Sequence, residues 1–295
     1  MLAPVLLGII HAIVDASTVS AVMRATHLND VSPQLAFAMV VGYDVIAFGS
    51  QVFFGWLTDR FLNPRIALAA GLVLTALGLV SSPLNNTATV ALAGIGNALF
   101  HLGGGALVLG SGLTRAAPQG VFVAPGALGL AFGLFYGSAP ARGPLWPLLA
   151  LTVVALVAFL AWRQFGTIPA QKPRQLAVVN PAVARHAYWI VALLLASITV
   201  RSLVGLSAAR GYSRTGLLII GLPIAAFLGK SLGGFLADRL GWLETSVAAL
   251  LLSLPFITLA PPTLWLLFGL FAFQMTMPVT LTAVAQLMPN HLATA

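Results

Sequence analysis

A histidine and a carboxylate share one face of the first apolar segment of this chain. His11, Asp15 and Thr18 are spaced i, i+4 and i+7, which places them on one side of a helix. Asp15 could carry a proton and His11 could adjust its affinity, because burial and a neighbouring imidazole both change how tightly a carboxyl holds its proton. The alternative is a local structural hydrogen bond near a helix end.

Two further apolar segments of the first half carry polar side chains at helical spacing. Asp44 and Gln51 are seven residues apart, so a continuous helix would place both on one face. Asn97 and His101 are four apart within a glycine-rich stretch, 94–105, which permits close packing or local unwinding. One interpretation of these pairs is a proton, cation or substrate pathway. The other is a set of satisfied contacts between helices.

The second half carries cations within its apolar runs. Arg201 and Lys230 could contact an anionic group, the arginine through a two-pronged fork and the lysine as a point charge. They could equally neutralise the carboxylates of the first half. Gln274, Thr276 and Thr280 add uncharged hydrogen-bonding capacity that helix packing would explain as well.

Enzyme chemistry finds little support in the sequence. It contains no HExxH, CxxC, GxSxG or GxxxxGK[ST] motif and no cysteine. Glu244 is its only glutamate, so a carboxylate-rich metal centre is not expected either. We therefore expect no catalytic residues, no metal site and no cofactor.

The elements that must position these side chains are expected to be membrane helices. Hydrophobic residues make up 59% of the 295 residues and charged residues only 7%, too few to cover a soluble protein. The net charge of +8 comes from bases spread singly along loops, which argues against nucleic-acid binding and fits loops facing an anionic leaflet. A charge at membrane depth costs at least roughly 2.5 to 3.5 kcal/mol, so the few that occur there are expected to face a cavity, to pair or to carry function.

Continuous apolar runs of about 20 residues predict membrane-spanning helices and exclude barrel strands. The ten expected spans are 3–23, 34–57, 65–81, 86–110, 119–138, 144–162, 187–208, 214–236, 243–260 and 263–287. The first has no basic leader and is expected to be retained. The polar segment 163–185 is expected to be a basic linker. More bases lie in the loops on the N-terminal side, which predicts a cytoplasmic N-terminus.

A six-residue motif occurs twice, once in each half. Residues 55–60 read GWLTDR and residues 234–239 read GFLADR, each at the expected end of the second helix of its half. Glycine there lets a neighbouring helix approach, while aspartate and arginine can cap helix ends and pair across an interface. The same register aligns Lys230 with Gln51. The candidate gating residues are Gly55, Asp59, Arg60, Gly234, Asp238 and Arg239.

These two copies, with the basic linker between them, resemble the loop signature of the major facilitator superfamily. The resemblance implies an all-α polytopic membrane protein with two pseudo-symmetric bundles. It predicts a six-helix bundle over 1–162, the linker over 163–185, and a second bundle over 186–295 with four helices. About ten of an expected twelve helices would then be present, which suggests a truncated chain or, alternatively, a natural ten-span variant.

The family resemblance implies a secondary transporter that moves a small organic solute by alternating access. Arg201 and Lys230 suggest a solute with an anionic part, and Asp15 or Asp44 would couple its movement to protons. Residues 94–105 are similar to the fourth helix of fosmidomycin-resistance-type members, which favours efflux. The expected partners are the solute, protons and the lipid of the inner or plasma membrane, and the chain is expected to be a monomer. The alternative is a non-transporting receptor or scaffold with this fold.

Overall fold

The computed structural model describes residues 1–28, 31–112, 114–165, 189–197, 199–200, 216–259, 263–288 and 290–295, and in these ranges it contains helices and no strand. The helices with given bounds are α1 (Leu2–Leu28), α2 (Pro33–Asp44), the π-helix η1 (Val45–Gly49), α3 (Gln51–Phe61), α4 (Pro64–Ser81), α5 (Asn86–Gly110), α6 (Ala117–Gly137), the short η2 (Pro140–Arg142), α7 (Trp146–Phe165), α9 (Gly216–Leu240), α10 (Trp242–Thr258), α11 (Thr263–Gln274) and α12 (Met277–Leu287). The expectation of an all-helical chain is confirmed.

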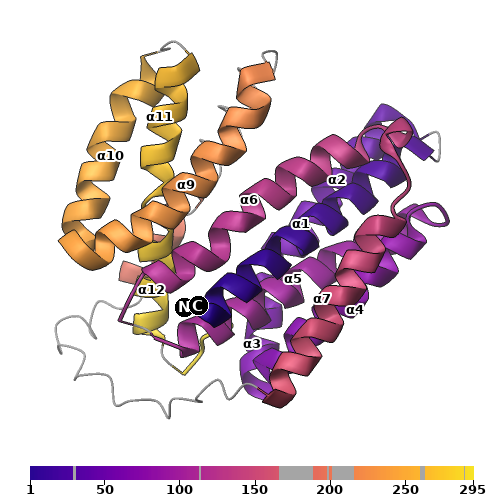
Figure 1. The fold of residues 1–295 in the computed structure, drawn as a ribbon, viewed down its shortest axis with the longest axis horizontal. Coiled ribbons are helices and arrows are strands. Elements are labelled where there is room, and N and C mark those ends of the chain that lie inside the picture. Colours follow the sequence, from indigo (N-terminus) through magenta and orange to yellow (C-terminus); the bar gives the residue numbers. More distant parts are fainter. Residues whose placement is uncertain are drawn as a thin grey trace.

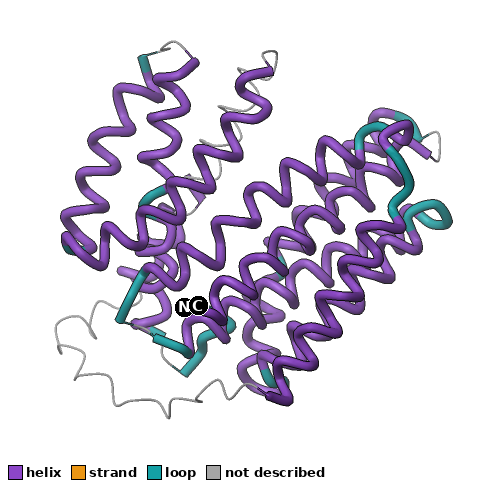
Figure 2. The backbone as a smooth tube through the Cα atoms, viewed as in Figure 1, coloured by secondary structure: helices purple, strands orange, loops and turns teal. Residues whose placement is uncertain are grey.

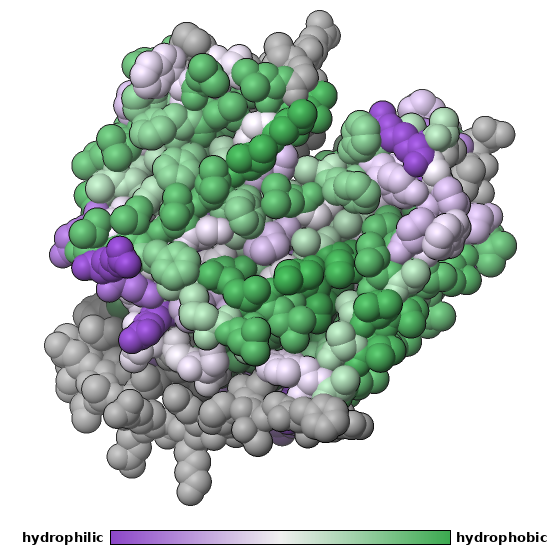
Figure 3. Space-filling model, viewed as in Figure 1, coloured by the Kyte–Doolittle hydropathy of each residue, from purple (hydrophilic) through white to green (hydrophobic). Residues whose placement is uncertain are grey.

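Each expected span except the seventh coincides with one helix or with consecutive helices. The seventh span, 187–208, lies largely outside the described residues, as does most of the linker 163–185. Within the described residues, 7 helical stretches are long and apolar enough to cross a membrane, and α7 and α10 contain shorter apolar stretches. Large apolar side chains are exposed along them, and Figure 3 shows polar residues gathered toward the margins of a mainly apolar face. The chain is an integral, multi-pass membrane protein.

Local sequence signals set where the helices begin. The side chains of Ser32, Asn63 and Asn85 accept hydrogen bonds from the backbone N–H groups at the starts of α2, α4 and α5. Proline follows Ser32 and Asn63 at the first helical position, where its missing N–H costs nothing. Gly241, with φ of 105°, joins α9 to α10 in a conformation that side-chain-bearing residues rarely adopt.

Helix α6 lies between two groups of helices. Figures 1 and 2 show α6 alongside α1 on one side, with α9 converging on the start of α6 on the other and α10 and α11 beyond α9. Helices α4, α5 and α7 complete the group around α1. Their shared core is formed by Leu7, Ile10, Val14, Leu68, Leu72, Phe100, Val108, Phe122, Val123, Ala155 and Phe159. The polar residues of α1 and α5 are therefore set into an apolar interior.

Glycines allow α6 to contact α1 closely. An added Cβ at Gly129 would meet the carbonyl oxygen of Ala12, and one at Gly133 would lie 2.9 Å from the carbonyl oxygen of Ala16. Gly137 continues the series one turn later. The spacing of four residues along α6 thus produces a close seam along the face of α1 that carries Asp15.

The second span contains an irregular turn. The π-helix η1 separates α2 from α3 and inserts one extra residue into the helical register. One residue corresponds to about 100° of rotation at 3.6 residues per turn. The expectation that Asp44 and Gln51 share one face is therefore wrong, because it assumed a continuous α-helix between them.

Candidate functional site

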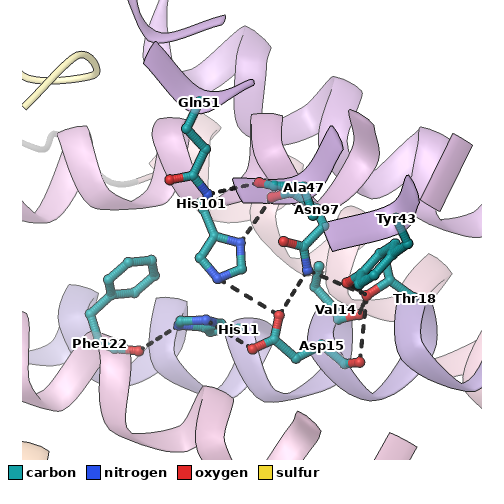
Figure 4. A network of polar contacts seen from close by, with 10 residues as sticks. All are labelled: His11, Val14, Asp15, Thr18, Tyr43, Ala47, Gln51, Asn97, His101 and Phe122. Carbon is teal, nitrogen blue, oxygen red and sulfur yellow. Dashed lines mark hydrogen bonds and ion pairs between the residues drawn. The ribbon is translucent and has the colours of Figure 1, made fainter. Parts of the chain in front are cut away.

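Asp15 lies at the centre of a polar cluster where α1, α5 and α6 meet (Figure 4). Its Oδ2 is 3.2 Å from Nε2 of His11, one turn earlier on α1. Its Oδ1 accepts a hydrogen bond of 2.9 Å from the side-chain amide of Asn97 and lies 3.7 Å from Nε2 of His101. Both carboxylate oxygens thus face groups that respond to protonation.

Each histidine of the cluster is held by a backbone carbonyl. Nδ1 of His11 is 2.9 Å from the carbonyl oxygen of Phe122 on α6, and Nδ1 of His101 is 2.9 Å from that of Asn97. The two rings contact each other edge to face with centroids 4.4 Å apart. These contacts turn both Nε2 atoms toward Asp15.

Hydroxyl groups extend the cluster toward α2. Thr18 donates to the carbonyl oxygen of Val14 and also lies 3.3 Å from the amide nitrogen of Asn97. The hydroxyl of Tyr43 is 3.0 Å from that of Thr18. The network therefore connects α1, α2 and α5 in addition to the carbonyl of α6.

The cluster is buried among apolar side chains. His11 is 4% exposed, Asp15 8% and Asn97 0%, while His101 is only partly buried. A charged or polar group in such surroundings is costly unless it is paired and hydrogen-bonded. The arrangement is therefore a site able to hold a proton under tight structural control.

The donor set of the cluster could also bind a cation. Nε2 of His11, Nε2 of His101 and a carboxylate oxygen of Asp15 lie within 4.8 Å of one another. A first-row metal would require all three at about 2.0–2.2 Å from one centre, which demands a contraction. The same atoms already contact one another and the side-chain amide of Asn97.

Gly126 of α6 leaves the space that the His11–Asp15 pair occupies. A Cβ there would lie 2.5 Å from Nε2 of His11 and 2.7 Å from Oδ2 of Asp15. We expect Gly126→Ala to push the two side chains apart, to cost about 1–3 kcal/mol through overpacking, and to lower the thermal unfolding midpoint.

Gly105→Ala is the matched control for this prediction. Its added Cβ would meet only the ring of Phe122, at an ordinary 3.9 Å. Thermal unfolding in detergent should separate the two variants. Equal behaviour would show that Gly126 does not position the pair.

The remaining candidate residues lie outside this cluster or at its border. Asp44 is exposed on α2, and the amide of Gln51 donates to the carbonyl oxygen of Ala47 within its own span. Lys230 of α9 is close enough to His101 to interact with it electrostatically. Arg201 lies outside the described residues.

Gln274 occupies the interrupted last span. It ends α11, just before the break that precedes α12, and its Oε1 is buried with no hydrogen-bond partner within the described part of the chain. The same holds for Oδ1 of Asn97, which Figure 4 shows turned toward His101. Both oxygens are buried acceptors that lack a donor among the described residues.

The two aspartates of the repeated motif make equivalent contacts. Asp238, near the end of α9, accepts hydrogen bonds from the backbone N–H groups of Ala116 and Ala117 at 2.7 and 3.0 Å, at the start of α6. Asp59, near the end of α3, accepts from those of Ala293 and Thr294 at 3.0 and 2.8 Å. Each carboxylate thus binds a pair of backbone amides distant in sequence.

The glycines of the motif make these approaches possible. A Cβ at Gly234 would lie 2.8 Å from the carbonyl oxygen of Ala116, and one at Gly55 would lie 2.5 Å from that of Ala293. Arg60 stacks on the rings of Trp56 and Phe61 in its own segment. Arg239 follows Asp238 and is exposed. Within the described ranges, Asp59 also accepts from the Thr294 hydroxyl at 2.7 Å and Asp238 from Nε1 of Trp242 at 3.2 Å, and neither aspartate forms an ion pair with an arginine.

Comparison with known proteins identifies the family to which this helical architecture belongs. The family model described as Major Facilitator Superfamily matches residues 5–295. The chain belongs to the major facilitator superfamily. A search of the curated proteins finds no match. The expected resemblance is thereby confirmed at the level of the superfamily, and the chain is a secondary transporter.

A solved structure supports the same fold for this major facilitator protein. The crystal structure of a Major Facilitator Superfamily transporter, FucP, in the outward conformation matches with a TM-score of 0.65 at 13% sequence identity. The match covers 95% of this chain and 87% of that chain. At this identity the likeness is evidence for the fold alone.

Three contributors to the cluster of this superfamily member were missed by sequence reasoning. Tyr43 was overlooked beside the charged Asp44, and the carbonyl of Phe122 carries no residue-type signal. Gly126 carried a sequence signal, because it follows Pro125 within an apolar helix, where a glycine often marks the close approach of a neighbouring helix. The i, i+4 spacings of His11 with Asp15 and of Asn97 with His101 were the usable signals.

Proposed function

We propose that the chain exports a small organic solute with an anionic part, driven by protons, through alternating access. The carrying observation is Asp15, which is buried at a crossing of helices with Nε2 of His11 at 3.2 Å and the amide of Asn97 at 2.9 Å. A buried carboxyl that gains and loses one proton changes its charge, and such a change can bias two conformations.

The solute is proposed to bind near the interface between α9 and the helices around α1. Lys230 of α9 interacts electrostatically with His101 of α5, so a cation and the proton site share that region. The unpaired oxygens of Asn97 and Gln274 would accept hydrogen bonds from hydroxyl or amine groups. An organic acid, a phosphonate or a drug with such groups fits this chemistry.

The repeated aspartates are proposed to gate the cytoplasmic side of the membrane. Asp238 holds the start of α6, and Asp59 holds residues 293–294. Releasing these four backbone hydrogen bonds would let the two halves separate there. A cytoplasmic N-terminus, location in the inner or plasma membrane, and a monomeric state complete the proposal.

Reconstitution tests the function directly. The full chain is placed in proteoliposomes with a pH-sensitive dye inside, and a panel of organic anions, phosphonates and drugs is added outside. Substrate-dependent proton movement that is lost in empty liposomes is the expected result. Oppositely directed pH gradients would then distinguish export from uptake. No proton movement with any member of the panel would contradict proton coupling and favour a receptor or scaffold.

A further inference from the structure

The proton positions in the cluster are constrained by the carbonyl groups around it. A carbonyl oxygen can only accept a hydrogen bond, so Nδ1 of His11, 2.9 Å from the Phe122 oxygen, must carry a hydrogen. The same reasoning applies to Nδ1 of His101, 2.9 Å from the Asn97 oxygen. In a neutral imidazole the other nitrogen then has a lone pair and no hydrogen.

Two lone pairs therefore point at one carboxylate unless extra protons are present. Nε2 of His11 is 3.2 Å from Oδ2 of Asp15, a hydrogen-bonding distance that joins two acceptors if both groups lack a proton. Nε2 of His101 approaches Oδ1 to 3.7 Å, beyond a normal hydrogen bond. The close pair thus requires one proton between its two atoms, and the longer contact leaves room for a second.

We infer that the coupling proton is shared by a three-group site, in which His11 and Asp15 hold it and His101 exchanges it with the interface facing α9. The side chain of His101 is 18% exposed, compared with 5% for His11 and 12% for Asp15. The proton passes from Nε2 of His101 to Oδ1 of Asp15, and the total charge of the site rises by one with each proton added.

The charged and titratable groups around the site are consistent with a proton held by His11 and Asp15 and exchanged through His101. Tyr43 approaches from α2 through Thr18, and Lys230 interacts with His101 from α9. The part of α6 that touches the site contributes the Phe122 carbonyl and Gly126. A lysine cation near His101 opposes a second proton there. Movement of α9 relative to α5 would therefore change the proton load of the cluster.

Nitrogen NMR of the full chain in lipid nanodiscs tests the inference without relying on transport. The chain is labelled with ¹⁵N-histidine, and His11→Gln and His101→Gln assign the signals. The expected result is that both rings carry hydrogen at Nδ1 at neutral pH. A neutral ring with hydrogen only at Nε2, for either histidine, would overturn the inference. Because this readout needs no substrate, it separates the inference from the proposed function on which its coupling role rests.

Flux measurements test the separate role of His101. His101→Gln is expected to lower proton-coupled flux about 10²-fold, the lower end of what a positioned proton-transfer group contributes, while His11 keeps its hydrogen at Nδ1. His27→Gln is the matched control, because Nδ1 of His27 also contacts a backbone carbonyl, that of Met23 at 2.8 Å, at the exposed end of α1. Parent-like flux in His101→Gln would contradict the exchange role.

Discussion

Asp15→Asn is expected to abolish proton-driven solute movement while the protein remains folded. The amide keeps the size of the carboxyl, can still accept from Asn97, and can donate to the lone pair on Nε2 of His11. It cannot take up and release a proton. We expect proton-coupled flux to fall by at least about 10²-fold, the lower end for a positioned proton-transfer group, as measured with the internal pH dye.

Asp44→Asn provides the comparison for this result. Asp44 is the other intramembrane carboxylate of the first half, but it is exposed on α2 and separated from α3 by the π-helix η1. The structure-based expectation is near-parent flux in this variant. A large loss of proton-coupled flux in Asp44→Asn, together with parent-like flux in Asp15→Asn, would show that the coupling site lies outside the cluster.

Asp238→Asn is expected to shift the protein toward the conformation in which the start of α6 is released from α9. The substitution removes the charge and leaves one oxygen for the two backbone N–H groups of Ala116 and Ala117. A hydrogen bond to a charged group contributes about 1.5–3 kcal/mol, so its loss changes the ratio of the two conformations by about 10- to 100-fold. Asp59→Asn should act in the same direction.

Thiol crosslinking measures this shift, because the sequence contains no cysteine. Cysteines introduced at the exposed Arg115 and Leu240 flank the Asp238 contact and would be the only thiols. Their crosslinking by a short reagent should slow in Asp238→Asn. Glu244→Gln, an acid in the first turn of α10, is the matched control and should leave the rate unchanged. An unchanged rate in Asp238→Asn would contradict a gating role.

The sequence was sufficient to predict much of the architecture because membrane helices carry strong local signals. Apolar length placed most spans, and the structure has Asn63–Pro64 and Asn85 at the starts of α4 and α5. Helical spacing joined His11 to Asp15 and Asn97 to His101. It could not bring the two pairs together, because that depends on how α1 packs against α5.

The π-helix and the partners of the motif aspartates depend on the backbone, so they could not be predicted from residue patterns. The π-helix η1 places Asp44 on a different face from Gln51. Its sequence, VIAFG, is that of an ordinary apolar helix and gives no sign of the extra residue. The repeated motif predicted aspartates at an interface, but their partners are backbone amides of α6 and of residues 293–294. Backbone amides have no side-chain signature, so the sequence could indicate helix capping or arginine pairing for these aspartates but could not identify the partners of either carboxylate.

The most direct test of the account compares net transport with exchange in the parent and in Asp15→Asn. Proteoliposomes are loaded with a transported solute, and its movement is followed first with a pH gradient and then with equal solute and equal pH on both sides. Asp15→Asn is expected to lose gradient-driven accumulation but still to exchange solute, since the helices and the gates are intact. Gradient-driven accumulation at the parent level in Asp15→Asn would contradict it.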